Sequence, residues 1–261
     1  MRRLLDIAMP LLVALLVLGG WEWAVAHWQV PVYVLPAPSA IARALADNFL
    51  SLMTSLLSTL TVTVEAFLAA SVLGITTAIA FSQSRLLERT LYPYAVILQV
   101  TPVVAIAPLI LIWVGFERIN LALTIIATIV AFFPILAGAT LGLKSADFNL
   151  TDLARLYGAS RAQILWRIRL PTALPYLLSG MKTAGGLALI GAVVAEFVAG
   201  SGTATGLAWR IVESGNRLEI ATLFAALALL AATGIVIFAA LSLLEWALLR
   251  RWHESAISRQ S

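Results

Sequence analysis

The sequence predicts an all-α integral membrane protein with about six transmembrane helices and both termini in the cytoplasm. Of its 261 residues, 61% are hydrophobic and 11% are charged, whereas soluble domains average about 45–50% apolar and about 25% charged residues. Six stretches reach the roughly 20 mostly apolar residues that a membrane-spanning helix needs. Basic residues are also divided unevenly between the loops on the two sides of these stretches. The solvent of this chain is therefore partly lipid.

The six apolar stretches leave no room for a separate soluble enzyme domain. Residues 1–50 are expected to form an N-terminal spanning helix and an external interfacial segment, residues 51–250 a membrane core, and residues 251–261 a cytoplasmic tail. The predicted spans are Ile7–Ala26, Leu56–Phe81, Tyr94–Trp113, Leu121–Leu141, Leu174–Ala199 and Ala221–Leu249.

The distribution of Lys and Arg fixes the expected topology. With the N-terminus inside, twelve of the seventeen basic residues fall in inner loops and four in outer loops, and Lys182 lies within the fifth span near its inner end, where it could snorkel. The net charge of +4 is explained by this bias, so no nucleic-acid partner is implied. A multi-pass membrane protein with both termini inside is expected.

The first span has a second interpretation. Arg2, Arg3, the apolar run and the small residues around Ala26 resemble a secretory signal peptide. The run is longer than a usual signal core, however, and Trp21, Trp23 and Trp28 suit the interfacial belt of a retained helix. We therefore expect the first span to be retained.

Residues 31–48 are expected outside, where Pro36 and Pro38 break regular structure and a short helix at the outer membrane surface follows Ser39. Ser39 can cap it, and Ile41, Leu45 and Phe49 repeat at helical spacing. Such a helix is either a docking or gating element or a simple connector.

The longest hydrophilic stretch is the cytoplasmic loop 142–171, which we expect to form two short helices against the inner membrane surface. Asn149 or Thr151 can cap the first helix, and Gly158 provides a left-handed residue that ends it. Ser160 then begins the second helix.

The second helix of the loop has clear boundary signals. Gln163 follows Ser160 by three residues, as in a capping box. Pro171 is expected to end this helix and begin the fifth span. The small residue Ala154, four positions before Gly158, lets a partner approach the corner closely. Without further information, the loop could also be a generic pair of basic interfacial helices.

The spacing of this loop resembles that of importer permeases of the ATP-binding-cassette class. Their cytoplasmic loop has the pattern E-A-A, three residues, G, nine residues, I-x-L-P. Here the matching residues are Asp152-Leu153-Ala154, Gly158 and Ile168-Arg169-Leu170-Pro171, with Asp152 and Leu153 departing from the usual Glu and Ala. The runs LPAPS from Leu35, TPVVAIAPLILIW from Thr101 and LPTALPYLLSGMKTAGGLALIGAVVAEFVAG from Leu170 are similar to the subfamily of taurine, sulfonate, nitrate, thiamine-precursor and riboflavin permeases.

The resemblance implies a type I importer transmembrane domain and a set of partners. These are a second copy of the chain, two ATPase subunits, and an extracytoplasmic solute-binding protein. ATP and magnesium would be bound by the ATPases, since the chain has no Walker motif, and the chain itself would need no cofactor and do no covalent chemistry. The solute would be a small N-heterocycle or a sulfonate, taurine or nitrate. Residues of the coupling loop (142–171) that would transmit ATPase closure are Asp152, Leu153, Ala154, Gly158, Ala159 and Ser160.

Polar side chains within the spans are candidates for the translocation pathway. Glu65, Gln99, Thr101 and Glu196 lie in apolar stretches, where an ionisable or polar group suggests function. Pathway lining or gating competes with an interhelical hydrogen bond as the role of each carboxylate. Pro102 and Pro108 can kink the third span.

The glycines of the fifth span, Gly180, Gly185, Gly186 and Gly191, predict close helix packing within the core or in a dimer. A self-sufficient secondary transporter is the alternative function, but neither inverted repeats nor broken helices with ion ligands are evident. A membrane-embedded enzyme would need a His, Asp or Glu constellation that these spans do not supply. The chain has no cysteine and two histidines, so no metal site is expected.

Overall fold

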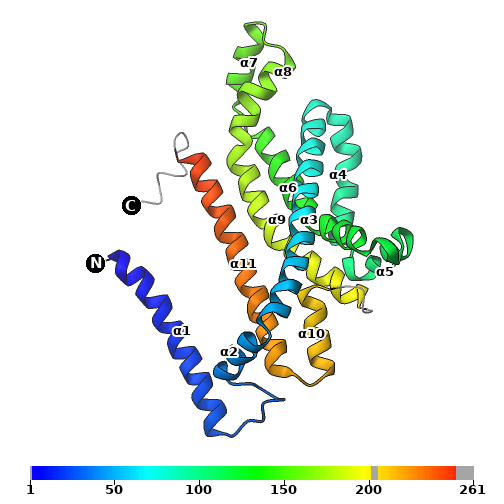
Figure 1. The fold of residues 1–261 in the computed structure, drawn as a ribbon. Coiled ribbons are helices and arrows are strands. Elements are labelled where there is room, and N and C mark those ends of the chain that lie inside the picture. The colour runs from blue at the N-terminus through cyan, green and yellow to red at the C-terminus, as the bar shows by residue number, and fades with distance from the viewer. Residues whose placement is uncertain (1, 201–204, 251–261) are drawn as a thin grey trace. The chain divides into compact units, whose positions relative to one another are not determined.

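The computed structural model describes residues 2–200 and 205–250, and this part of the chain is helical throughout its regular structure (Figure 1). The α-helices are α1 (Arg2–His27), α2 (Pro38–Asp47), α3 (Phe49–Gln83), α4 (Arg85–Val100), α5 (Val103–Val114), α6 (Ile119–Lys144), α7 (Phe148–Leu156), α8 (Arg161–Ile164), α9 (Leu170–Ala199), α10 (Leu207–Asn216) and α11 (Ile220–Leu249). A short 3₁₀ helix, η1 (Phe116–Arg118), precedes α6, and a π-helical turn, η2 (Leu165–Arg169), joins α8 to α9.

Five helical stretches are long and apolar enough to cross a membrane, and a bent pair of helices raises the number to six. The prediction of an all-α chain with about six spans is confirmed. The five continuous stretches are Ala8–His27, Phe49–Gln83, Ile119–Lys144, Arg161–Ala199 and Ile220–Leu249.

The third predicted span, Tyr94–Trp113, is not a single helix. Its residues belong to α4 and α5, which meet at an angle of 100°. Thr101 is extended at this break, with φ −70° and ψ 126°, because the ring of Pro102 disfavours helical backbone in the residue before it. The second proline considered for a kink, Pro108, lies inside α5 without ending it.

The described residues form two compact units. The first contains residues up to Ser58 together with Thr205–Ala231, and the second contains Thr59–Ala204 and the chain from Ala232 onward. Helices α3 and α11 each contribute to both units.

In the second unit, α6 and α9 pack closely because small residues face each other along both helices. A Cβ atom on Gly138 would lie 2.8 Å from the carbonyl oxygen of Tyr176, and one on Gly180 would lie 2.6 Å from that of Pro134. At the other end of the pair, a Cβ on Gly191 would meet the backbone of Ala127 at 2.8 Å. These contacts have opposite sequence directions, so the two helices are antiparallel.

The predicted packing role of the fifth-span glycines therefore holds for three of the four. Gly180 and Gly191 face α6, whereas Gly185 faces Leu241 of α11. Gly186 has no heavy atom within 4 Å of a built Cβ position, so within this chain its face of α9 is open.

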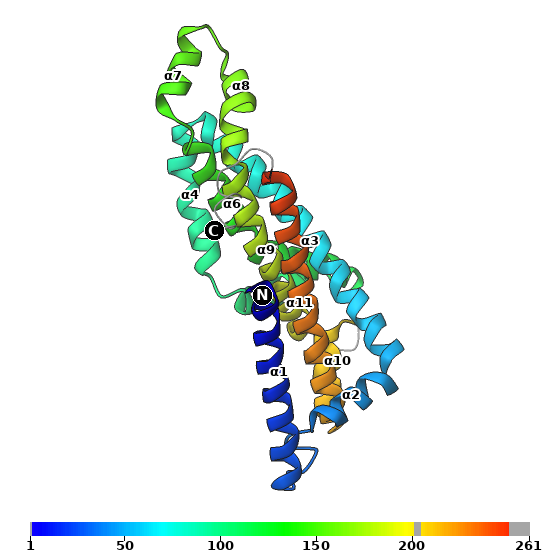
Figure 2. The same cartoon turned by 90° about the vertical axis from the view of Figure 1, so that its left-hand side faces the viewer.

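Contacts of α3 and α11 complete the arrangement of the second unit. Gly74 packs on Ile135, and Glu65 accepts a hydrogen bond from Thr124, so α3 runs parallel to α6. The contact of Gly234 with Leu189 makes α11 antiparallel to α9. The end of α3 and the beginning of α4 therefore lie beside the end of α6 and the beginning of α9, at the end of this unit that carries α7 and α8 (Figures 1 and 2).

The first unit is built from α1, α2, α10 and the first turns of α3 and α11. Its core contains Leu52, Leu207 and Ile211, and Ile41 and Leu45 of α2 pack against that core. The predicted helix near residues 39–48 is confirmed as α2, but its apolar side chains pack on protein. Ser39 is not the cap of α2, which begins after Ala37.

Ser39 forms hydrogen bonds to α1 instead of capping α2. Its backbone N–H and its hydroxyl both donate to the carboxylate of Glu22, at 3.0 and 2.7 Å. This pair of hydrogen bonds ties the end of α1 to the start of α2.

Candidate functional site

The coupling loop folds into a helical hairpin at one end of the second unit, formed by α7 and α8 (Figures 1 and 2). The first helix begins at Asp147, whose side chain accepts a hydrogen bond of 2.8 Å from the backbone of Asn149. The predicted caps Asn149 and Thr151 were wrong by two or more residues. Asp147 is the better cap because its carboxylate also interacts favourably with the helix dipole.

The corner after α7 is a Schellman motif centred on Gly158. Gly158 has φ +77°, and its N–H donates to the carbonyl of Arg155 at 2.9 Å. The next residue, Ala159, donates to the carbonyl of Ala154 at 3.0 Å. These two bonds satisfy carbonyls that the helix end would otherwise leave free, and the predicted left-handed role of Gly158 is confirmed.

The chain then enters a capping box that is also as predicted. The hydroxyl of Ser160 accepts from the N–H of Gln163 at 3.2 Å, and the side chain of Gln163 accepts from the N–H of Ser160 at 2.7 Å. Both sides of the Gly158 corner are thus fixed by local hydrogen bonds.

Pro171 does not separate the second helix from the fifth span, contrary to the prediction. Helix α8 continues through the π-helical turn η2 into α9, and Pro171 lies in the first turn of α9. Proline lacks an N–H and crowds the carbonyl four residues earlier. The wider π turn immediately before it accommodates this defect, so residues 161–199 form one continuous helical stretch of 39 residues.

The tip of the hairpin exposes apolar side chains. Leu156 and Tyr157 are each 85% exposed, and Leu153 is 51% exposed. Asp152, the acidic residue of the motif, forms an ion pair of 2.9 Å with Arg155 on the same helix. The partner of the motif's carboxylate therefore belongs to the hairpin itself. The expectation that the loop lies against the inner membrane surface stays a prediction. An exposed apolar cluster of this kind is typical of a surface that contacts a protein partner or a membrane.

The two carboxylates predicted in the spans have different surroundings. Glu196 is 1% exposed and accepts a hydrogen bond of 2.8 Å from the hydroxyl of Thr59, which joins α9 to α3. Glu65 is on an exposed part of α3 and accepts a hydrogen bond of 2.9 Å from Thr124. A carboxylate that is exposed within an apolar span avoids lipid, and it faces either a partner or a water-filled space.

The other two predicted pathway residues lie at the break between α4 and α5. Gln99 is exposed in the last turn of α4, and the hydroxyl of Thr101 donates to the carbonyl of Ile97 at 2.7 Å. The backbone N–H of Thr101 donates to the same carbonyl at 3.0 Å, so the hydroxyl adds a second, local hydrogen bond at the end of α4. The positions of Gln99 and Thr101 thus belong to a bend rather than to a straight span.

Sequence reasoning missed an ion pair inside the membrane region. Lys182 of α9 and Glu245 of α11 lie 2.5 Å apart, and each side chain is only 18% exposed. The positive charge of Lys182 therefore has a partner within the chain, and the pair keeps both charges compensated where the dielectric constant is low. The signal for this pairing was present, since an unpaired intramembrane carboxylate at Glu245 would be costly.

Within residues 2–200 and 205–250, no group of three or more His, Asp or Glu side chains is arranged to hold a metal ion. His253 lies outside the described residues, and His27 is stacked on Trp23.

Comparison with known proteins relates this geometry to a family. Residues 70–251 match the family described as binding-protein-dependent transport system inner membrane component. The chain is 34% identical to the riboflavin transport system permease protein of Chloroflexus aurantiacus, over 92% of this chain and 88% of that one. It is 32% identical to the formylaminopyrimidine transport permease protein of Halalkalibacterium halodurans, over 94% and 96%.

A solved structure has the same fold. The crystal structure of an amino acid ABC transporter with histidines matches 79% of this chain and 96% of that one, with a TM-score of 0.59 and 19% identity. The matched family region contains both the hairpin and most of the second unit. The chain therefore belongs to the inner membrane component family of binding-protein-dependent transport systems, the membrane permeases of ATP-binding-cassette transporters.

Proposed function

We propose that two copies of this chain form the translocation pathway of an ATP-binding-cassette importer. Two ATPase subunits would bind the hairpins, supply the ATP and magnesium sites, and drive the cycle, while an extracytoplasmic binding protein would deliver the solute. The observation that carries this proposal is the hairpin itself. It combines the family's motif residues, a corner fixed from both sides, and an exposed apolar tip.

Motion of the ATPase would reach the membrane through one continuous helix. The stretch Arg161–Ala199 contains 39 residues, which at 1.5 Å per residue is about 59 Å long. If the ATPase displaced the hairpin, α9 would therefore tilt or shift as a unit. The hairpin residues that would transmit this displacement are Asp152, Leu153, Ala154, Gly158, Ala159 and Ser160. Since α9 packs along α6 without intervening side chains at Gly138 and Gly180, α6 would move with it.

A second copy of the chain would cover the open face of α9. Gly186 has free space at its Cβ position, and Ile190, one turn further, is 55% exposed. A small residue on an exposed helical face permits close approach of another helix in a membrane. This feature favours a homodimer with α9 near its interface.

Of the four polar candidates, Glu65 is the one we assign to the pathway, because it is the carboxylate that an apolar span leaves exposed. Glu196 is assigned to holding α9 against α3 through Thr59. Gln99 and Thr101 would act at the bend between α4 and α5, where a change of angle alters the width of a pathway.

The proposed topology places both termini and the hairpin in the cytoplasm of a bacterium, with the chain in the inner membrane. The excess of basic residues on the hairpin side supports this orientation. Reporter fusions at Ser261 and near Asn48 are expected to read cytoplasmic and extracytoplasmic, respectively. An extracytoplasmic signal at Ser261 would contradict the six-span topology.

The proposed solute is a small nitrogen heterocycle related to riboflavin or a thiamine precursor. The two relatives named above support this class. Uptake of radiolabelled riboflavin, formylaminopyrimidine, taurine and nitrate by cells expressing the complete transporter tests this choice. Uptake of taurine or nitrate alone would exclude a heterocycle as the solute.

The test of the central proposal is co-purification with the ATPase followed by transport in vesicles. Ala154→Arg would place a large charged side chain at the hairpin, and it is expected to abolish ATPase association while membrane insertion stays normal. Arg161→Ala, on a solvated face, is the matched control and should retain association. Transport that proceeds without ATP or without an ATPase subunit would instead support a secondary transporter.

A further inference from the structure

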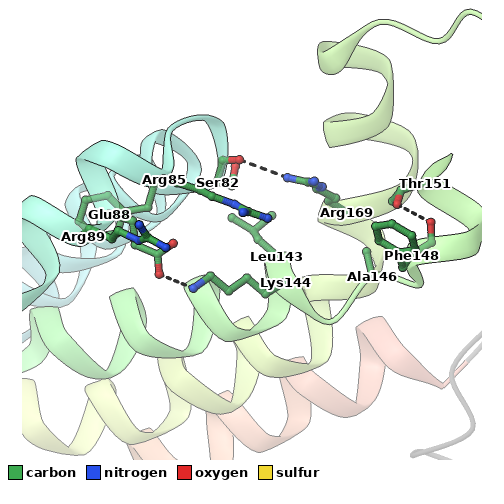
Figure 3. A pocket seen from close by; sticks show the side chains of 11 residues that line it. Ser82, Arg85, Glu88, Arg89, Leu143, Lys144, Ala146, Phe148, Thr151 and Arg169 are labelled. Carbon is green, nitrogen blue, oxygen red and sulfur yellow. Dashed lines mark hydrogen bonds and ion pairs between the residues drawn. The ribbon is translucent and has the colours of Figure 1, made fainter. Parts of the chain in front are cut away.

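A basic pocket lies at the base of the hairpin, between the end of α3, the start of α4, the end of α6, the start of α7 and the π turn η2 (Figure 3). Its volume is about 520 Å³. Four basic side chains and one carboxylate line it together with Phe81, Leu143 and Phe148; the basic residues are Arg85, Arg89, Lys144 and Arg169. They come from three segments that are far apart in sequence.

Most of this positive charge has no carboxylate partner in the described chain. Lys144 forms an ion pair with Glu88, which leaves three arginines. Arg169 donates one hydrogen bond of 3.2 Å to the backbone carbonyl of Ser82. Among the described residues, Arg85 and Arg89 form no ion pair. Figure 3 shows Arg85 and Arg169 extending toward each other from opposite walls.

The positive region continues toward the hairpin. A second cavity of about 380 Å³ shares Ser82, Arg85 and Arg169 with the first and adds Arg161, together with Arg155, whose charge is paired with Asp152. Like charges held this close repel one another, so a bound anion would stabilise the arrangement. Guanidinium groups converging from several directions match the oxygens of a phosphate group.

We propose that this pocket binds a phosphate group, and specifically the phosphodiester of an anionic membrane lipid. Two features favour a lipid as the source of the phosphate. The pocket lies at the ends of apolar helices, and Leu86 and Leu87, next to Arg85, are exposed apolar residues at 76% and 44%. Lipid chains can cover such a surface while the headgroup enters the pocket. Basic pockets at the ends of transmembrane helices recognise anionic headgroups in this way.

The bound lipid would act on the hairpin. Arg169 lies in η2, the π turn that joins the hairpin to α9, and Arg85 begins α4. A headgroup that bridges these two arginines would fix the base of the hairpin relative to the ends of α3 and α4. The proposal is independent of the ATPase contact, because binding concerns the permease alone.

The test is native mass spectrometry of the purified full-length chain with phosphatidylglycerol and, separately, phosphatidylcholine of the same acyl chains. The wild type is expected to retain phosphatidylglycerol preferentially. The double variant Arg85→Gln/Arg89→Gln should weaken that binding about 25-fold, which is about fivefold per arginine, the typical contribution of one basic residue near an anionic lipid surface. Both side chains are exposed, so the fold should survive.

Controls separate the possible sources of the effect. Arg118→Gln, at an exposed arginine outside the pocket, should change phosphatidylglycerol binding by less than twofold, and Arg85→Lys/Arg89→Lys should recover part of it. Equal retention of both lipids by the wild type, or an equal loss in Arg118→Gln, would overturn the proposal. Competition by millimolar inorganic phosphate as strong as that by phosphatidylglycerol would show that a soluble phosphate is the ligand and refute the lipid. Loss of phosphatidylglycerol binding on adding the ATPase would identify the pocket as part of the ATPase interface instead.

Discussion

Replacement of Gly158 by valine tests whether the shape of the hairpin corner matters. Gly158 has φ +77°, a conformation that costs an L-residue about 1–2 kcal/mol and more for a β-branched side chain. A Cβ atom at this position would meet nothing within 4 Å, so the cost comes from the backbone and not from a collision. The population of the native corner conformation, relative to that of other conformations, would therefore fall by about 5- to 30-fold.

The assay measures affinity for the ATPase and coupled ATP hydrolysis after reconstitution in vesicles. We expect Gly158→Val to insert and dimerise normally, because the packing of the spans is untouched, but to bind the ATPase about 5- to 30-fold more weakly. Gly158→Asn should be milder, since asparagine tolerates the left-handed region better than other non-glycine residues.

Gly20→Val is the matched control for Gly158→Val. Gly20 also has free space at its Cβ position, but it lies in the regular helix α1 without a positive φ. It should leave ATPase binding unchanged. Wild-type affinity in Gly158→Val would refute the role of the corner, and an equal loss in Gly158→Asn would show that a side-chain contact, rather than backbone strain, is responsible.

Three other substitutions probe the membrane core. Lys182→Met should lower the free energy of unfolding of the purified protein by about 3–5 kcal/mol, because it leaves Glu245 as an unpaired charge. The additional change Glu245→Leu should restore most of that loss. Gly180→Val should also destabilise the protein, by about 1–3 kcal/mol or more, since its Cβ would lie 2.6 Å from the carbonyl oxygen of Pro134. Glu196→Gln should retain near-normal transport, because the amide oxygen can still accept a hydrogen bond.

The controls for these substitutions come from the same elements. Gly186→Ala adds a Cβ on α9 where nothing lies within 4 Å, so the monomer's stability should not fall as it does in Gly180→Val. Equal destabilisation by both would contradict the packing of α9 on α6. A Lys182→Met/Glu245→Leu protein as unstable as the single variant would argue against a compensated ion pair. Loss of transport in a well-assembled Glu196→Gln complex would make Glu196 part of the pathway.

Features that depend on residues close together in the chain could be predicted from sequence alone. The apolar runs predict the spans because a bilayer sets a minimum length for any crossing helix. The corner at Gly158 and the capping box of Ser160 and Gln163 were predicted because each is formed by residues at most a few positions apart. A turn of this kind depends little on the rest of the chain.

Tertiary structure decided the features that depend on distant residues. The pairing of Lys182 with Glu245, the burial of Glu196 and the exposure of Glu65 follow from how the helices face one another, which hydropathy cannot specify. Pro171 was misread because the π turn before it removes the conflict that normally ends a helix. The pocket lined by Arg85, Arg89 and Arg169 exists because α3 and α6 run parallel and α9 runs antiparallel to them. This arrangement brings together chain segments that lie next to the ends of these helices. Sequence thus determined which segments enter the membrane, and long-range packing determined which side chains meet.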